Sequence, residues 1–174
     1  VFAPGADFEA LLRSSARSLF SLESREPLGR FDIIGFSLLY ELNYTNVLTM
    51  LDLARIPMLA CDRNHCHPLI IAGGPCTCNP EPMADFFDAM VVGDGEKVIM
   101  QMAAAWMDWK REKTAERQSL LKSWSQIEGV YIPSFFEPRF DQNGLQTLAP
   151  RFPDYRQVKR ALSLIHISEP TRPY

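Results

Sequence analysis

Thiol and imidazole side chains gather in one short stretch of the chain, between residues 61 and 78. The group consists of Cys61, His65, Cys66, His67, Cys76 and Cys78. Both side-chain types bind zinc and other soft metals, and zinc sites usually take their ligands in pairs about two to four residues apart. The cysteine spacings do not match this pattern, and in an extended loop the two His would point away from Cys66. The pattern favours a surface loop with incidental His and small buried Cys, with a metal site as the minor alternative.

A second group of residues could form a ligand-binding surface but supplies no nucleophile. Ser37 places a small hydroxyl beside an apolar floor, and Gly73 and Gly74 lack the Cβ atoms that would keep a flat ligand or a phosphate from the backbone. Gly93 and Gly95 open a helical segment, whose first amides can hold an anionic group. Each glycine pair alone indicates a tight turn. Three such turns in succession predict a shared ligand-binding edge.

The elements that position these turns follow from apolar patterning. Three nearly continuous apolar runs predict strands buried on both faces, at residues 31–39, 69–72 and 89–92. Segments with helical spacing follow each of them, at residues 43–54, 80–87 and 96–113. This alternation predicts an α/β fold with a doubly wound, Rossmann-like parallel sheet over residues 1–113. Ligands of such sheets bind outside the carboxyl ends of the strands, where the glycine turns lie.

The chain changes character after the third helical segment. Residues 115–128 form another amphipathic pattern, and residues 135–140 and 145–148 flank an Asp-Gln-Asn-Gly turn typical of a β-hairpin. We therefore expect residues 114–162 to be a helix and hairpin linker leading to a further domain.

Both ends of the sequence are unusual. The chain opens on Val1 with no signal-peptide pattern, and residues 163–174, including His166, resemble the translation of a sequencing adaptor. We exclude those residues from functional reasoning. The sequence is interpreted as a piece of a longer gene, with its N-terminal strand missing.

Composition excludes several functional classes. The 174 residues are 47% hydrophobic and 22% charged, with a net charge of −3, which is typical of a globular protein with a core. The 18 Lys and Arg are scattered, so no footprint for nucleic acid or an anionic membrane is present in the sequence. No apolar run approaches the roughly 20 residues that a bilayer requires. The few cysteines do not resemble a secreted disulfide framework, so we expect a cytoplasmic protein.

Two remaining sets of residues have structural interpretations. Asp94 and Glu96 form a carboxylate pair at the start of a predicted helix, where we expect them to cap it and to complement its dipole. Trp106, Trp109 and Trp124 are expected to pack in the core or at a domain interface.

Taken together, four segments resemble the N-terminal domain of radical S-adenosylmethionine (radical SAM) proteins with a cobalamin-binding-like domain. The resemblance covers roughly residues 1–160, and its order and spacing are carried by residues 32–46, the Ile-Ala-Gly-Gly-Pro of 71–75, the Asn-Pro-Glu-Pro of 79–82 and the Val-Gly-Asp-Gly-Glu of 92–96.

The resemblance implies a Rossmann-like domain that precedes a barrel. In the family, a Cys-x3-Cys-x2-Cys motif of the barrel binds the [4Fe–4S] cluster that cleaves S-adenosylmethionine. The cysteines of this chain do not form that motif. The resemblance therefore implies a radical SAM parent enzyme of unknown substrate, with the missing barrel as the partner in cis and no catalytic residue in this fragment.

The resemblance also implies a cofactor site. In the family pattern, the Ser-x-Leu and Gly-Gly elements border the nucleotide tail of cobalamin, and Ser37 would hydrogen-bond its buried base. The matching cofactor-binding positions are Ser37, Leu39, Gly73, Gly74, Gly93 and Gly95. The cobalt-ligating Asp-x-His-x-x-Gly element would precede Val1. The alternative is a non-catalytic, flavodoxin-like binding or interaction module whose glycine turns only shape the backbone.

Overall fold

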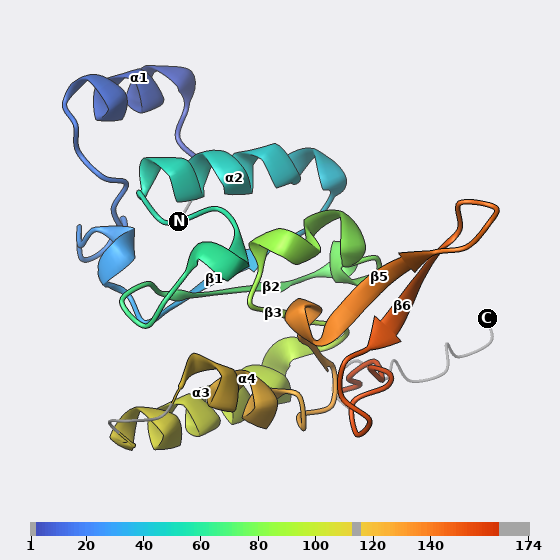
Figure 1. Cartoon of the computed structure of the whole chain (residues 1–174). Coiled ribbons are helices and arrows are strands. Elements are labelled where there is room, and N and C mark those ends of the chain that lie inside the picture. Colours follow the sequence, from blue (N-terminus) through green and yellow to red (C-terminus); the bar gives the residue numbers. More distant parts are fainter. Residues whose placement is uncertain (1–2, 113–115, 164–174) are drawn as a thin grey trace, which may run out of the picture.

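A computed structural model describes residues 3–112 and 116–163, which form a three-layer α/β arrangement (Figure 1). The central sheet has the strand order β1-β2-β3-β4. Its strands are β1 (Ile33–Ser37), β2 (Leu69–Gly73), β3 (Ala89–Val91) and β4 (Val130–Tyr131). The first three strands are parallel, and β4 runs antiparallel to β3. The α/β fold with a mostly parallel sheet is thus confirmed.

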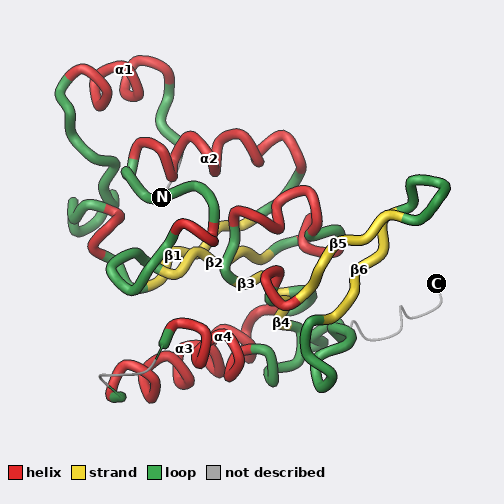
Figure 2. The backbone as a smooth tube through the Cα atoms, viewed as in Figure 1, coloured by secondary structure: helices red, strands yellow, loops and turns green. Residues whose placement is uncertain are grey.

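Helices cover both faces of this sheet. Helix α2 (Tyr44–Leu53) lies on one face and α1 (Ala6–Ser14) packs against it, while α3 (Gly95–Arg111) and α4 (Arg117–Trp124) lie on the other (Figure 2). The interior between the layers is filled by fully buried side chains, among them Leu38, Leu51, Ile70, Phe87, Met90, Met102, Leu120 and Trp124. Within the described ranges, no helix is long and apolar enough to cross a bilayer.

The prediction of an α-helix at residues 80–87 is wrong in the type of helix. The chain there forms a 3-10 helix, η5 (Glu81–Phe86). The segment is only six residues long, because the backbone turns extended at Phe87, and short helical pieces commonly take 3-10 geometry. The other predicted helices are present with ends shifted by a few residues.

Residues after α3 complete the sheet. The Trp124 indole Nε1 of α4 donates to the carbonyl oxygen of Met102 in α3 at 3.0 Å, so the two helices are fastened together inside the core. Strand β4, which the sequence pattern missed, pairs with β3 through Tyr131 and Val130. Two residues are too few for an alternation to show in the sequence.

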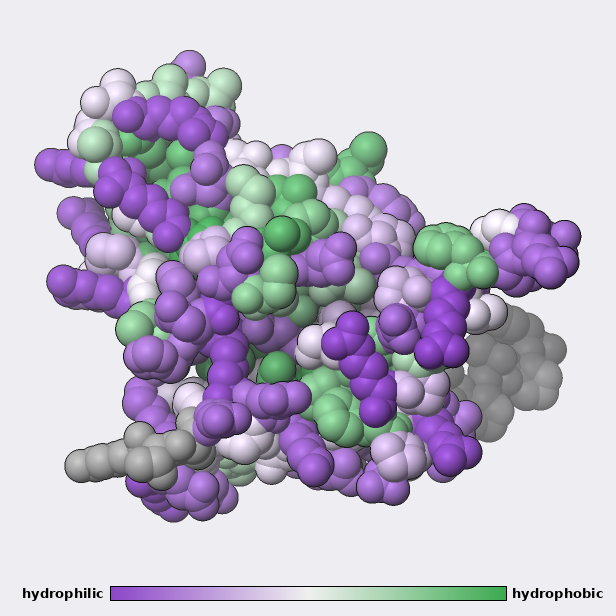
Figure 3. Space-filling view, in the orientation of Figure 1, coloured by the Kyte–Doolittle hydropathy of each residue, from purple (hydrophilic) through white to green (hydrophobic). Residues whose placement is uncertain are grey.

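The predicted hairpin is confirmed. It consists of β5 (Phe136–Phe140) and β6 (Gln146–Pro150), which form a separate antiparallel pair. In the turn, Asp141 Oδ1 accepts the backbone N–H groups of Asn143 and Leu145, each at 2.8 Å. Figure 3 shows a largely hydrophilic face, with apolar side chains gathered over α2 and on this hairpin.

Candidate functional site

The first two predicted turns lie side by side at the carboxyl ends of β1 and β2. Ser37 is in register with Gly73, and the Leu38 N–H donates to the Gly73 carbonyl at 2.7 Å. The Leu38 carbonyl in turn accepts the Cys76 N–H at 3.1 Å. Because the Leu38 side chain is buried, it fixes this loop to the core, while Leu39 beside it is 60% exposed.

The two glycines of the second turn have different roles. Gly74 has a φ of +104°, and a Cβ there would lie 2.8 Å from the Leu38 carbonyl oxygen. Gly74 is therefore needed so that the two loops can approach each other. A Cβ on Gly73 would meet no atom within 4 Å. Gly73, with the exposed Ser37 next to it, thus faces open space at the sheet edge.

Thr77 holds the second turn from the side of the core, and Cys76 lies beside the turn. The fully buried Thr77 Oγ1 lies 2.8 Å from the Gly74 carbonyl oxygen and 2.7 Å from that of Val91, which ties the turn to β3. Partial burial, followed by the neighbouring Cys76 thiol, raises the pKa of Tyr44.

The third turn is filled by the protein's own chain. Gly93 has a φ of +107°, and a Cβ on it would lie 2.2 Å from the Ala161 carbonyl oxygen. The Ala161 N–H donates to the Val92 carbonyl at 2.9 Å, and the Asp94 N–H donates to the Ala161 carbonyl at 3.0 Å. Gly129 leaves room for the same residue, since its Cβ would lie 2.5 Å from the Ala161 Cβ.

The start of α3 differs from the expected capping. Asp94 occupies the N-cap position but makes no side-chain bond to the helix; its Oδ2 accepts the Ser163 N–H at 2.6 Å instead. The capping prediction for Asp94 is therefore wrong, because the returning chain takes its carboxylate. Glu96 does lie in the first turn of α3. A Cβ on Gly95 would meet no atom within 4 Å.

The Cys and His residues stay apart. All four thiols are free, and Cys61, Cys66 and Cys78 are exposed. The Nδ1 of His67 accepts the Asn64 N–H at 3.1 Å, so this imidazole stabilises its own loop. Among residues 3–112 and 116–163, no three Cys, His, Asp or Glu side chains converge as a metal site would require.

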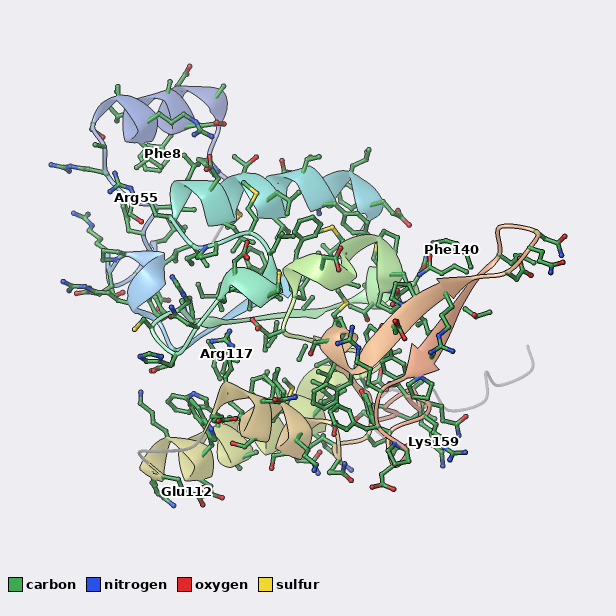
Figure 4. All side chains as sticks on the ribbon, in the orientation of Figure 1. Phe8, Arg55, Glu112, Arg117, Phe140 and Lys159 are labelled. Atoms are coloured by element: carbon green, nitrogen blue, oxygen red, sulfur yellow. The ribbon has the colours of Figure 1, made fainter. Side chains whose placement is uncertain are left out.

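Sequence reasoning missed a buried network of charged residues at the opposite end of the strands, next to the start of β3. Asp88 Oδ2 lies 2.9 Å from Arg63 Nη1 and accepts the Ile70 N–H at 2.7 Å, and Asp88 Oδ1 lies 2.9 Å from Arg117 Nη2. Burial lowers the pKa of Arg63. The three residues of this network come from distant parts of the chain, so only an acidic residue, Asp88, within an apolar run could have signalled it. Figure 4 shows Arg117 lying between the sheet and the α3–α4 layer.

A cleft of about 860 Å³ lies between η5, β4 and the hairpin. Its wall is rich in aromatic side chains, namely Phe87, Tyr131, Phe135, Phe136 and Phe140. Tyr131 donates a hydrogen bond to Glu81, which also accepts Gln146 Nε2 at 3.1 Å. The cleft contains none of the six predicted cofactor-binding residues.

Comparison with known proteins decides the family. The model of the family described as "Radical SAM proteins, N-terminal" matches residues 1–133, which is most of the chain. The chain belongs to this family. An uncharacterized protein of Methanocaldococcus jannaschii is 33% identical over 87 residues, which cover 48% of this chain and 18% of that protein. The match thus spans less than a fifth of that relative's length, and none of the solved structures matches the chain.

Membership implies a [4Fe–4S] cluster and S-adenosylmethionine in the parent proteins. The described residues of this N-terminal radical SAM domain do not fit the cluster, because they bring no three cysteines together. The open turn at Ser37 and Gly73 is the part of the predicted site that has room for a ligand.

Proposed function

We propose that this chain is the N-terminal module of a radical SAM enzyme and that its β1–β2 turns hold the nucleotide tail of a cobalamin. The observation that carries the proposal is the juxtaposition of Ser37 with Gly73, in register and open to the outside. Radical chemistry belongs to the barrel in the rest of the parent protein, which is the partner in cis, and the cytoplasm is the expected compartment.

The chemistry of the turn suits a flat heterocycle with polar edges. Ser37 supplies a hydroxyl that can donate to or accept from a ring nitrogen. Gly73 leaves the backbone bare so that a ring can approach it, and the exposed Leu39 offers apolar area beside it. Gly95 at the start of α3 is the other predicted position that remains open. Gly93 is not open, because its missing Cβ makes room for Ala161 of the same chain.

The proposal is tested by titrating the folded protein with hydroxocobalamin and following its visible absorption. We expect a saturable shift with the natural chain and its loss in Gly73→Val. A Cβ at position 73 meets no protein atom within 4 Å, so we expect this variant to fold and to obstruct only the ligand. Gly5→Val, also placed in open space but far from the turn, is the matched control and should titrate like the natural chain.

A second candidate function is supported by Gly74 and Gly93, two of the glycines with positive φ. The missing Cβ atoms of Gly74 and Gly93 face the chain's own backbone, as expected of a non-catalytic, flavodoxin-like module whose turns carry no cofactor. A flat titration with folded protein, or an equal shift in Gly73→Val, would overturn the cobalamin site. A flat titration would favour the non-catalytic module without a cofactor.

A further inference from the structure

A cavity of about 600 Å³ lies in the loop that connects α1 to β1. Its volume is within the range of sites that bind small molecules. The side chains around it are of two kinds, basic and apolar, with one hydroxyl; they are Arg17, Ser18, Phe20, Leu22, Arg25 and Pro27. No acidic residue of the described structure lines this arginine cavity.

The two guanidinium groups of the arginine cavity have no partner. Other arginines of this region form ion pairs, namely Arg13 with Glu9 and Asp52, and Arg30 with Glu26. Neither Arg17 nor Arg25 makes a side-chain hydrogen bond or an ion pair to any residue that the structure describes. Both residues are exposed, so their donors are accessible from outside. The cavity therefore has two positive charges that nothing in the described chain balances.

The apolar floor of the cavity is fixed in place. Leu19 and Leu28 are buried, and the Leu28 N–H donates to the Leu19 carbonyl at 2.9 Å. Next to them, Phe20 and Pro27 form an antiparallel bridge. The Phe20 ring also meets the Phe8 ring of α1 edge-on, with the ring centroids 6.0 Å apart (Figure 4). A ligand would find this surface already formed, which lowers the cost of ordering it on binding.

The backbone around the cavity has an uncommon conformation. Ala16, Arg25 and Arg55 are the non-glycine residues with positive φ in the described chain, at 52°, 55° and 57°. The Arg55 guanidinium donates to the Ala16 carbonyl, so all three belong to this region. Residues with a Cβ rarely adopt positive φ, and those that do gather at ligand-binding and other functional sites. This conformation is an observation independent of the two unpaired charges.

The neighbouring end of α2 does not oppose an anion. Free carbonyl groups at the end of a helix carry partial negative charge. Here the Leu53 carbonyl accepts the Leu19 N–H at 2.9 Å, and the Ala54 carbonyl accepts the Ser18 hydroxyl at 3.1 Å. Because these oxygens are bonded within the protein, the two guanidinium groups dominate the charge of the cavity.

We propose that the arginine cavity binds a small molecule in which a phosphate monoester is joined to a flat apolar group. Guanidinium groups bind phosphate oxygens through paired N–H donors, and a phosphate monoester carries up to about two negative charges at neutral pH. The two charges of Arg17 and Arg25 match such a dianion. Phe20, Leu22 and Pro27 offer apolar area to the rest of the molecule. Two cations are too few for a nucleic acid or a bilayer surface.

This site is separate from the proposed cofactor turn. The cavity adjoins the end of α2 that carries Leu53, whereas Tyr44, at the start of α2, lies beside Cys76 of the turn after β2. The inference therefore does not rest on cobalamin binding.

The test is isothermal titration calorimetry of the folded chain with phenyl phosphate, inorganic phosphate and benzoate. We expect saturable binding of phenyl phosphate that is at least about tenfold tighter than that of inorganic phosphate, because only the ester covers the apolar floor. We also expect it to be at least about tenfold tighter than that of benzoate, because a carboxylate carries a single charge.

Two variants locate the binding. Arg25→Asn removes one guanidinium and leaves a residue that tolerates positive φ, and Arg17→Gln removes the other. We expect each to weaken phenyl phosphate binding at least about tenfold. Arg151→Gln removes the same charge from an exposed position after the hairpin and should bind like the natural chain. If Arg25→Asn does not fold, Arg17→Gln decides, since it leaves the backbone at position 25 unchanged.

Four results would overturn the proposal. Absence of saturable binding by the folded chain removes the site, and unchanged affinity in the arginine variants places it elsewhere. Equal affinity for inorganic phosphate shows that the apolar floor takes no part. Equal affinity for benzoate shows that the site does not select a phosphate. The hydroxocobalamin titration has no bearing on any of these results.

Discussion

At the residue scale, the strongest charge cluster of the described structure is the one around Asp88. Its carboxylate balances two guanidinium groups, and the Arg63 and Arg117 side chains are 0% and 16% exposed. Arg63 Nη2 also donates to the carbonyl oxygens of Met58 and Phe86, and Arg117 donates to those of Asn64, His67 and Pro68. The network therefore ties α4 and the 58–68 loop to the start of β3.

Neutralising this carboxylate should unfold the protein more readily. We expect Asp88→Asn to lower the free energy of unfolding by about 3–5 kcal/mol, because it leaves two largely buried guanidinium groups without a counter-charge. Urea denaturation measures the change. Asp108→Asn is the control, since Asp108 is 74% exposed and its pair with Arg111 should be worth about 1 kcal/mol or less. Equal losses in the two variants would contradict the assignment.

Tyr155 provides a pH-dependent contribution. Its hydroxyl donates to the Val130 carbonyl at 2.6 Å and accepts the Ile132 N–H at 3.1 Å, and burial raises the pKa of Tyr155 to about 12. An unfolded tyrosine ionises near pH 10, so the folded state favours the protonated form. Its contribution to stability is complete below about pH 10 and is lost as the pH rises toward 12.

The measurement compares the natural chain with Tyr155→Phe by denaturation across that pH range. We expect the natural chain to be the more stable at neutral pH and the difference to shrink between pH 10 and about 12. Tyr40→Phe removes a hydroxyl at an exposed position and is the control, which should change the stability little. A Tyr155→Phe difference that stays constant would contradict this prediction.

At the scale of elements, the segment around Ala161 acts as a strap across the ends of β3 and β4. It forms a parallel bridge with Gly93, and two positive-φ glycines make room for it. Upstream in the same returning segment, Tyr155 fastens the chain to β4. The strap fills the third predicted turn, so the turns after β1 and β2 are the part of the predicted edge where Gly73 faces open space.

Adding one methyl group should dislodge this strap. We expect Gly93→Ala to lower the free energy of unfolding by about 2 kcal/mol or more, since a left-handed backbone alone costs a residue with a Cβ about 1–2 kcal/mol and the new Cβ meets the Ala161 carbonyl. Gly95→Ala, in open space at the helix start, should be neutral or slightly stabilising. Thermal denaturation and limited proteolysis at residues 155–161 report the two effects.

At the scale of the molecule, the sheet is asymmetric. The β3–β4 side is closed by the strap, by α4 and by the Asp88 network. The β1 side has an unprotected strand edge and an exposed flank of α3. The Ser37 and Gly73 turn lies at the strand ends on that open side.

The sequence by itself determined the three parallel strands, most helices and the hairpin. Apolar runs, helical spacing and an Asn-Gly turn act over a few residues, so their signals are local and readable. The family followed from motifs in the same way. The 3-10 geometry of η5 and the two-residue β4 were not predicted because both elements are short, which weakens the local signals.

Only the tertiary structure decided what each chemical group faces. Gly73 and Gly93 are both glycines at strand ends, yet one opens to the outside and the other receives Ala161. Asp88 and Arg117 are 29 positions apart and meet because the fold places α4 below the sheet. Such contacts depend on where distant segments pack, and residue type and spacing do not encode that placement locally.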